Sequence, residues 1–177
     1  RSSDLHHLEK YIHLACKAQL HRGPDDQRCF IDQGIALGAS RLAIRDPAKG
    51  IQPMERRGLV IVFNGELYET KALKERLINL GHQFETECDT EVLLNAFLEF
   101  GSSILPELVG MFAFAIWDSQ NRTLYLARDR WGEKPLYYTF GNGFLAFASE
   151  IKGLRIWPHL EWNVSVEDVN IFLQNSY

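Results

Sequence analysis

Asn64-Gly65-Glu66 is the first segment whose residue types suggest chemistry. It follows residues 59–63, an apolar run continuous enough to predict a buried strand that ends at Asn64-Gly65. A strand that delivers an asparagine side chain and a glycine amide to one point provides two neutral donors, which suit an oxyanion developing from a carbonyl. The same dipeptide is typical of a hairpin turn, so the residues alone leave both interpretations open.

Two charged residues suggest the binding of charged groups. Arg41 follows an apolar stretch, so its guanidinium could stand at a sheet edge, where its fork of donors matches a carboxylate. A surface salt bridge is the alternative for this residue. Asp89 occupies the position of a helix cap, and it could hold a ligand ammonium if that helix faces a pocket.

The cysteines and the N-terminal histidines suggest structural roles. Cys16, Cys29 and Cys88 are an odd number without paired spacing, which favours neither a disulfide framework nor a zinc site. No histidine close to them in sequence suggests a Cys–His pair, and Cys88, which we expect to be the more exposed thiol, lacks a basic neighbour to activate it. His6 and His13 lie two helical turns apart, too far for a chelating pair without a third ligand, so we predict no metal site.

Helices and hairpins must position these residues. The spacing of apolar residues predicts helices at 3–20, 70–80 and 90–100, and a last helix that begins at Ser165 and still runs near Tyr177, so we expect the chain to continue. β-prone runs separated by turn residues predict strands at 28–31, 35–42, 59–63, 111–118, 123–128, 136–140 and 144–148. This order indicates an α+β architecture in which sheets are sandwiched by helices.

The composition argues against several classes of protein. The 177 residues are 46% hydrophobic and 24% charged, with a formal net charge of −4, which is typical of a globular domain and argues against bulk binding of nucleic acid or anionic membranes. No apolar run approaches the roughly 18 residues of a membrane span, and no signal peptide is recognisable. We therefore expect a cytoplasmic protein without nucleic-acid or membrane partners.

A series of motifs along nearly the whole chain connects it to a known family. The motifs are His21-Arg22-Gly23-Pro24-Asp25, Ser40-Arg41-Leu42-Ala43-Ile44, Asn64-Gly65-Glu66-Leu67-Tyr68, Cys88-Asp89-Thr90-Glu91, Gly110-Met111-Phe112-Ala113-Phe114-Ala115 and Arg128-Asp129-Arg130-Trp131-Gly132-Glu133-Lys134-Pro135-Leu136-Tyr137-Tyr138. Taken together, they resemble the amidotransferase domain of glutamine-hydrolysing asparagine synthetase, a class II glutamine amidotransferase of the N-terminal-nucleophile hydrolase type.

The resemblance implies a fold and a pocket. The fold would be a four-layer αββα sandwich of antiparallel sheets whose opening strand is missing here, and the pocket would bind glutamine. Asn64 and Gly65 would form the oxyanion hole, and Asp89, with the Gly65-Glu66 segment, would hold the α-ammonium of glutamine. Its α-carboxylate would be bound along one wall by Arg41 and by the backbone of Leu42, Ala43, Ile44 and Arg45.

The sequence departs from the family at its start. The family's nucleophile is a terminal cysteine whose own α-amine, with a free pKa of about 8, serves as the base. This sequence begins Arg1-Ser2-Ser3, so the resemblance places the opening strand and its cysteine upstream. Either the natural protein has that strand, or the domain is catalytically silent and only packs on a synthetase domain that acts on another acceptor. The intact pocket residues favour the first explanation.

The resemblance also implies a domain organisation and partners. Residues 1–160 would be the glutaminase domain, truncated at its N-terminus, and residues 161–177 would begin the connection to a C-terminal synthetase domain. Ammonia from glutamine would pass to that domain for the ATP-dependent amidation of aspartate. We expect no cofactor in this domain, with ATP and magnesium bound by the synthetase domain, since no phosphate-cradling glycine loop is recognisable. A homodimer is compatible with this organisation.

Overall fold

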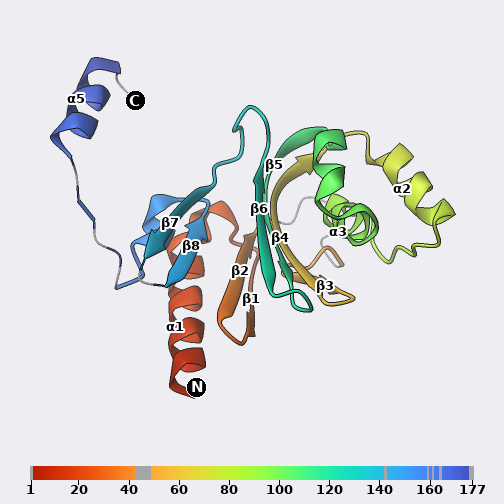
Figure 1. Ribbon diagram of the computed structural model, residues 1–177, viewed down its shortest axis with the longest axis horizontal. Helices are drawn as coiled ribbons and strands as arrows, with labels where there is room; N and C mark the ends of the chain where they lie inside the picture. Colours follow the sequence, from red (N-terminus) through yellow and green to blue (C-terminus); the bar gives the residue numbers. More distant parts are fainter. Residues whose placement is uncertain are drawn as a thin grey trace.

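The elements of the protein stack in four layers (Figure 1). Helices α2 (Thr70–Asn79) and α3 (Asp89–Phe100) form one outer layer, and α1 (Ser2–Ala18) with the short α4 (Ile151–Leu154) forms the other. Two β layers lie between them. The computed structural model describes residues 2–42, 49–141, 143–158, 160, 162–163 and 165–175.

The first β layer is an antiparallel sheet in the order β3-β4-β5-β6. Strands β4 (Leu59–Leu67) and β5 (Gly110–Asp118) pair over their whole lengths, and β6 (Thr123–Arg128) pairs with β5. Strand β3 (Met54–Arg56) pairs with β4 only as far as Ile61. Beyond Ile61, no strand of the described residues lies on that side of β4, and we call the stretch 62–67 the open edge of β4.

The second β layer consists of two antiparallel hairpins. One pairs β1 (Asp26–Asp32) with β2 (Ile35–Arg41), and the other pairs β7 (Tyr137–Gly141) with β8 (Phe144–Ala148). Among the described residues the two hairpins are separate sheets. Helix α1 packs on β1 and β2 and contacts α4, which in turn packs on β8, so the outer helices join the two hairpins.

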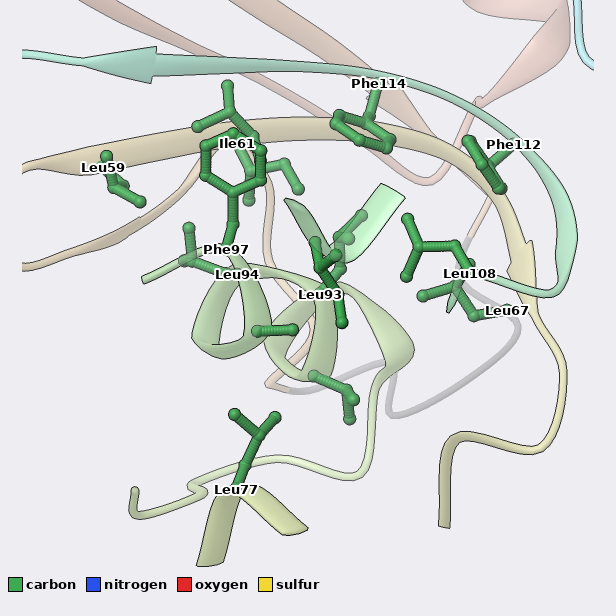
Figure 2. Close-up of a cluster of buried hydrophobic side chains, with 14 residues drawn as sticks. Leu59, Ile61, Leu67, Leu77, Leu93, Leu94, Phe97, Leu108, Phe112 and Phe114 are labelled. Carbon is green, nitrogen blue, oxygen red and sulfur yellow. The ribbon is translucent and has the colours of Figure 1, made fainter. Parts of the chain in front are cut away.

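The main hydrophobic core lies between α3 and the first sheet (Figure 2). Alternate residues of β4 enter it, and α3 contributes the side chains that face them. Its members include Leu59, Ile61, Leu67, Leu77, Leu93, Leu94, Phe97, Leu108, Phe112 and Phe114. Burying one such side chain stabilises a fold by roughly 1.5–3 kcal/mol, so the core holds α3 firmly against β4. The start of α3 is therefore fixed beside the open edge of β4.

The opposite face of the first sheet packs against the second β layer. Val60 and Val62 of β4 point to this side, where they meet Trp117 of β5 and Leu37 of β2. Because successive strand residues alternate between faces, the next even-numbered residues of β4 also point between the two β layers. This alternation decides where Asn64 and Glu66 lie.

Most predicted elements are present, but the end of β4 is not where we predicted it. The prediction that this strand ends at Asn64-Gly65 is wrong, and so is the hairpin-turn alternative, because β5 pairs with β4 out to Leu67. Long-range pairing overrides the local turn preference of the dipeptide. Strand β3 and helix α4 were not predicted, since 3 and 4 residues are too few for a periodic signal.

Short helices and the last helix complete the chain. The 3₁₀ helices are η1 (Leu20–Arg22) and η2 (Gly101–Glu107). Helix α5 (Val166–Asn175) begins as predicted, because the Asp168 N–H donates to Ser165 Oγ at 3.0 Å. It lies apart from the four layers in Figure 1. None of the helices in the described part of the chain is long and apolar enough to span a membrane.

Candidate active site

A cavity of about 1710 Å³ opens between the two β layers and is lined by α1, β2, β4, β5, β8 and the start of α3. The structure brings the predicted site residues that it describes together on its wall. These are Arg41, Leu42, Asn64, Gly65, Glu66 and Asp89. The predicted contributions of Ala43, Ile44 and Arg45 lie outside the described residues.

Asn64 presents a buried donor to this cavity. It lies on the face of β4 that looks toward the second β layer, as the burial of Val60 and Val62 on that face requires. Its Nδ2 is buried and has no hydrogen-bond partner among the described residues. Because an unsatisfied buried polar group costs about 1–3 kcal/mol, such a group in a cavity wall indicates a position where a ligand completes the hydrogen bond.

Gly65 places a second donor at the open edge of β4, one residue after Asn64. At the open edge of β4, the Phe63 N–H donates to Gln52 Oε1 at 2.7 Å, and the Leu67 N–H donates to Asp89 Oδ2 at 3.0 Å. Amides of alternate strand residues point the same way, so the Gly65 N–H lies at this edge between the two. Only glycine fits here, since φ is +155° and a Cβ would overlap the carbonyl oxygen of Met111.

Asp89 joins the start of α3 to the end of β4. We predicted Asp89 as the capping residue of this helix. In the structure Cys88 holds the capping position, and Asp89 is the first residue of the helix. Its Oδ1 accepts the Thr90 N–H at 3.0 Å, and its Oδ2 accepts the Leu67 N–H. An ionised carboxylate can accept about four hydrogen bonds, so these two amide bonds are compatible with an ammonium contact as well.

Arg41 ends β2 on the same cavity as Asp89. Its position is fixed by the hairpin, because it pairs with Asp26 of β1 and its carbonyl accepts the Asp25 N–H at 3.1 Å. Leu42 follows and is half exposed. The cavity thus has a guanidinium group on the second β layer and a carboxylate at the start of α3.

A buried ion pair supports the turn before α3. Glu91 is 1% exposed, and its carboxylate lies 2.6 Å from Arg56 Nη2. It also accepts the Glu85 N–H at 2.9 Å, the Thr86 N–H at 2.7 Å and the Thr86 hydroxyl at 2.7 Å. The Thr86 Oγ1 in turn accepts the Cys88 N–H at 3.2 Å. We call Glu91, Arg56, Glu85 and Thr86 the Glu91 network, and it holds the chain that leads into Asp89.

Sequence reasoning missed Gln52 and Thr90, which also line the cavity. Gln52 accepts the Phe63 N–H and donates through Nε2 to Thr90 Oγ1 at 3.2 Å. It therefore links a loop, the open edge of β4 and α3. The two side chains are 38 residues apart, and no local pattern signals their contact.

The thiols differ from our expectations. Cys88 is buried, so the expectation that it is the more exposed thiol is wrong; the Thr86 Oγ1 lies 2.9 Å from its sulfur. The fold also brings together a Cys–His pair that sequence separation hid, with Cys29 Sγ 3.6 Å from His13 Nδ1. A hydrogen bond between Cys16 and Cys29 lowers the pKa of Cys16 and raises that of Cys29. No group of three or more metal-binding side chains occurs in the described ranges.

Asp129 shapes the exposed loop that follows β6. Its carboxylate accepts the N–H groups of Phe112 at 3.3 Å, Trp131 at 3.0 Å, Glu133 at 2.9 Å and Lys134 at 3.0 Å. Burial alone would raise the pKa of Asp129, but the amide hydrogen bonds outweigh it and lower the pKa to about 2. The carboxylate therefore stays ionised and holds the loop.

Comparison with known proteins connects this geometry to a family. The family model of a glutamine amidotransferase domain matches residues 2–177. The glutamine-hydrolyzing asparagine synthetase 3 of Bacillus subtilis is 41% identical over 147 residues, which cover 81% of this chain and 24% of that protein. The glutamine-hydrolyzing asparagine synthetase 3 of Arabidopsis thaliana is 41% identical over 137 residues, covering 76% of this chain and 23% of that protein.

A solved structure agrees with these relatives. The glutamine phosphoribosylpyrophosphate amidotransferase of B. subtilis, in complex with ADP and GMP, superposes with a TM-score of 0.58 at 28% identity. The match covers 68% of this chain and 29% of that chain. This chain thus spans less than a third of each of these relatives. By sequence and by fold, the chain belongs to the glutamine amidotransferase domain family and has the antiparallel αββα architecture of N-terminal-nucleophile hydrolases.

Proposed function

We propose that this domain hydrolyses the side-chain amide of glutamine and supplies ammonia to an asparagine synthetase reaction. The observation that carries the proposal is the buried Asn64 Nδ2, which has no partner among the described residues and lines the cavity beside the Gly65 N–H. Two neutral donors at one point stabilise the negative oxygen of a tetrahedral intermediate, where charge develops during amide hydrolysis.

The charged groups of the cavity match the remainder of a glutamine molecule. Arg41 would bind the α-carboxylate, with the backbone of residues 42–45 on the same wall, because a guanidinium fork pairs with a carboxylate. Asp89 and the Gly65-Glu66 segment would hold the α-ammonium. The amide end of the substrate would then reach Asn64.

The nucleophile would be a cysteine carried by a segment that precedes residue 1. Its thiol would give its proton to the α-amine of the same residue and attack the amide carbon. The C–N bond would break as the α-ammonium returns a proton to the leaving ammonia, and water would then hydrolyse the thioester to glutamate. The size of the cavity supports this, because about 1710 Å³ exceeds the roughly 300–1,000 Å³ of a small-molecule site and leaves room for an extended segment.

Ammonia would be used by another part of the protein. The relatives that share the sequence are named as asparagine synthetases and are several times longer than this chain, which supports a fused synthetase domain. We assign residues 1–160 to the glutaminase domain and residues 161–177 to the connection. ATP and magnesium would be bound by the synthetase domain, where aspartate would be amidated.

Glutamate release by the protein at its natural length tests this function. We expect Asn64→Ala to lower kcat by about 100-fold to 1,000-fold, which is the usual effect of removing one oxyanion donor. Asn121→Ala is the matched control, because this asparagine lies in the exposed β5–β6 turn. Glutamine binding without turnover in the unmodified protein, or equal kcat values for the two variants, would contradict the proposal.

A further inference from the structure

Gln52 is a polar residue of the cavity wall to which the proposed reaction gives no role. Its side-chain amide makes one hydrogen bond at each end. Oε1 accepts the Phe63 N–H of β4 at 2.7 Å, and Nε2 donates to the Thr90 hydroxyl of α3 at 3.2 Å. Both ends are therefore attached to elements that the hydrophobic core holds in place.

Gln52 and Asp89 bind the two ends of the open edge of β4. Gln52 accepts the Phe63 N–H, and Asp89 accepts the Leu67 N–H at 3.0 Å. The Gly65 N–H lies midway between these two amides and points the same way. The peptide plane that carries the Gly65 donor is thus flanked on both sides by amides that side chains have fixed.

The Gly65 donor depends on such flanking because the residue itself provides little restraint. Glycine has no side chain to pack, and its φ of +155° lies in a region where glycine is the favoured residue. Beyond Ile61, β3 no longer pairs with β4, so no ladder hydrogen bond of the described strands restrains this edge. β5 pairs with the other edge of β4 through this stretch, so the Gly65 N–H is held by that ladder on one side and by the fixed amides of Phe63 and Leu67 at the open edge.

We infer that Gln52, anchored by Thr90, is a positioning residue that aims the Gly65 N–H at the reacting oxygen of glutamine. The inference rests on the proposed function, because it assigns Gly65 to the oxyanion hole. Gln52 acts through Phe63 and β4 and need not touch the substrate. Loss of the link would leave the charged groups that bind the substrate in place and would misdirect only the donor.

Steady-state glutamine hydrolysis by the protein at its natural length tests the inference. In Gln52→Leu, which removes both hydrogen bonds at similar volume, we expect kcat to fall about 10-fold to 100-fold, as misplacement of a catalytic group by about 1 Å does. We expect KM to change less than about threefold. Thr90→Val removes only the anchor and should have a smaller effect of the same kind. Thr90→Ser keeps the hydroxyl and should restore kcat.

A second readout separates positioning from general loss of structure. The γ-aldehyde analogue of glutamine forms a tetrahedral adduct with a thiol, and the oxygen of that adduct would occupy the proposed oxyanion hole. Its affinity should therefore fall in parallel with kcat in Gln52→Leu and Thr90→Val. Unchanged kcat in both variants would overturn the inference, and so would a lower kcat with unchanged affinity for the aldehyde.

The outcomes distinguish this inference from the proposed function. If the unmodified protein releases no glutamate, the proposed function fails. If it hydrolyses glutamine and the Gln52 and Thr90 variants do so equally well, only the positioning role fails. Melting temperatures of the variants show whether Gln52→Leu still folds, and Thr90→Val provides the same test with a nearly isosteric change.

Discussion

The Glu91→Gln substitution tests whether the Glu91 network holds the start of α3. Glu91 is 1% exposed and accepts hydrogen bonds from Arg56, the Glu85 N–H, the Thr86 N–H and the Thr86 hydroxyl. The glutamine amide has one accepting oxygen in place of two, and its NH₂ group faces donors. The variant also leaves Arg56 without its buried countercharge.

The magnitude follows from burial. Neutralising one partner of a buried ion pair destabilises a protein by about 3–5 kcal/mol. The Arg56 side chain is 21% exposed and keeps the Gln83 carbonyl as a partner at 2.6 Å, which places the expected loss at the lower end, about 3 kcal/mol. This loss corresponds to an increase of about 100-fold to 200-fold in the opening equilibrium of α3.

Hydrogen exchange of the α3 amides measures this opening in the protein at its natural length. Glu85→Gln is the matched control, because its carboxylate lies 3.4 Å from the same arginine but is 83% exposed. An exposed pair contributes about 0–1 kcal/mol, so the control should change protection less than about fivefold. Equal protection of α3 in the two variants would refute the assignment of the Glu91 network.

Two further substitutions test other parts of the structure. Gly65→Ala should lower the melting temperature by about 5–10 °C, because the added Cβ would overlap the Met111 carbonyl. Gly81→Ala is the control and should lower the melting temperature less, because the space around Gly81 is open. Equal changes in the two variants would contradict the steric reasoning. Asp129 has a folded pKa of about 2, below its unfolded value of 3.8, so its contribution to stability is complete above about pH 4 and is lost as pH falls through 2. Urea midpoints between pH 5 and pH 2 should decline less in Asp129→Asn than in the unmodified protein, and parallel curves would rule out this contribution.

Much of the fold follows from local patterns in the sequence. The apolar run 59–63 predicted β4, and the helical stripe of 90–100 predicted α3, because burial on a strand or helix leaves a period that the sequence shows. The residue types at 64–66 also suggested a pair of donors, and the structure places Asn64 and Gly65 on the cavity wall. Their position within a strand, in place of a turn, depended on pairing with β5, which lies about 50 residues away and leaves no local signal.

The supporting contacts of the site could not be predicted in this way. Gln52 meets Thr90, and Arg56 meets Glu91, across 38 and 35 residues. Each is an ordinary polar residue in its own segment, and only the packing of α3 on β4 brings them together. The same reason explains why the contact between Cys29 and His13 was missed.

The split of the second β layer has a consequence for the behaviour of the protein in solution. The β1–β2 and β7–β8 hairpins are separate two-stranded ribbons among the described residues, so no described strand pairs with their outer edges. Two-stranded ribbons are marginal by themselves, and their edges are templates for pairing with another chain. The outer edges of the two hairpins are therefore the places in the second β layer where a further strand can pair.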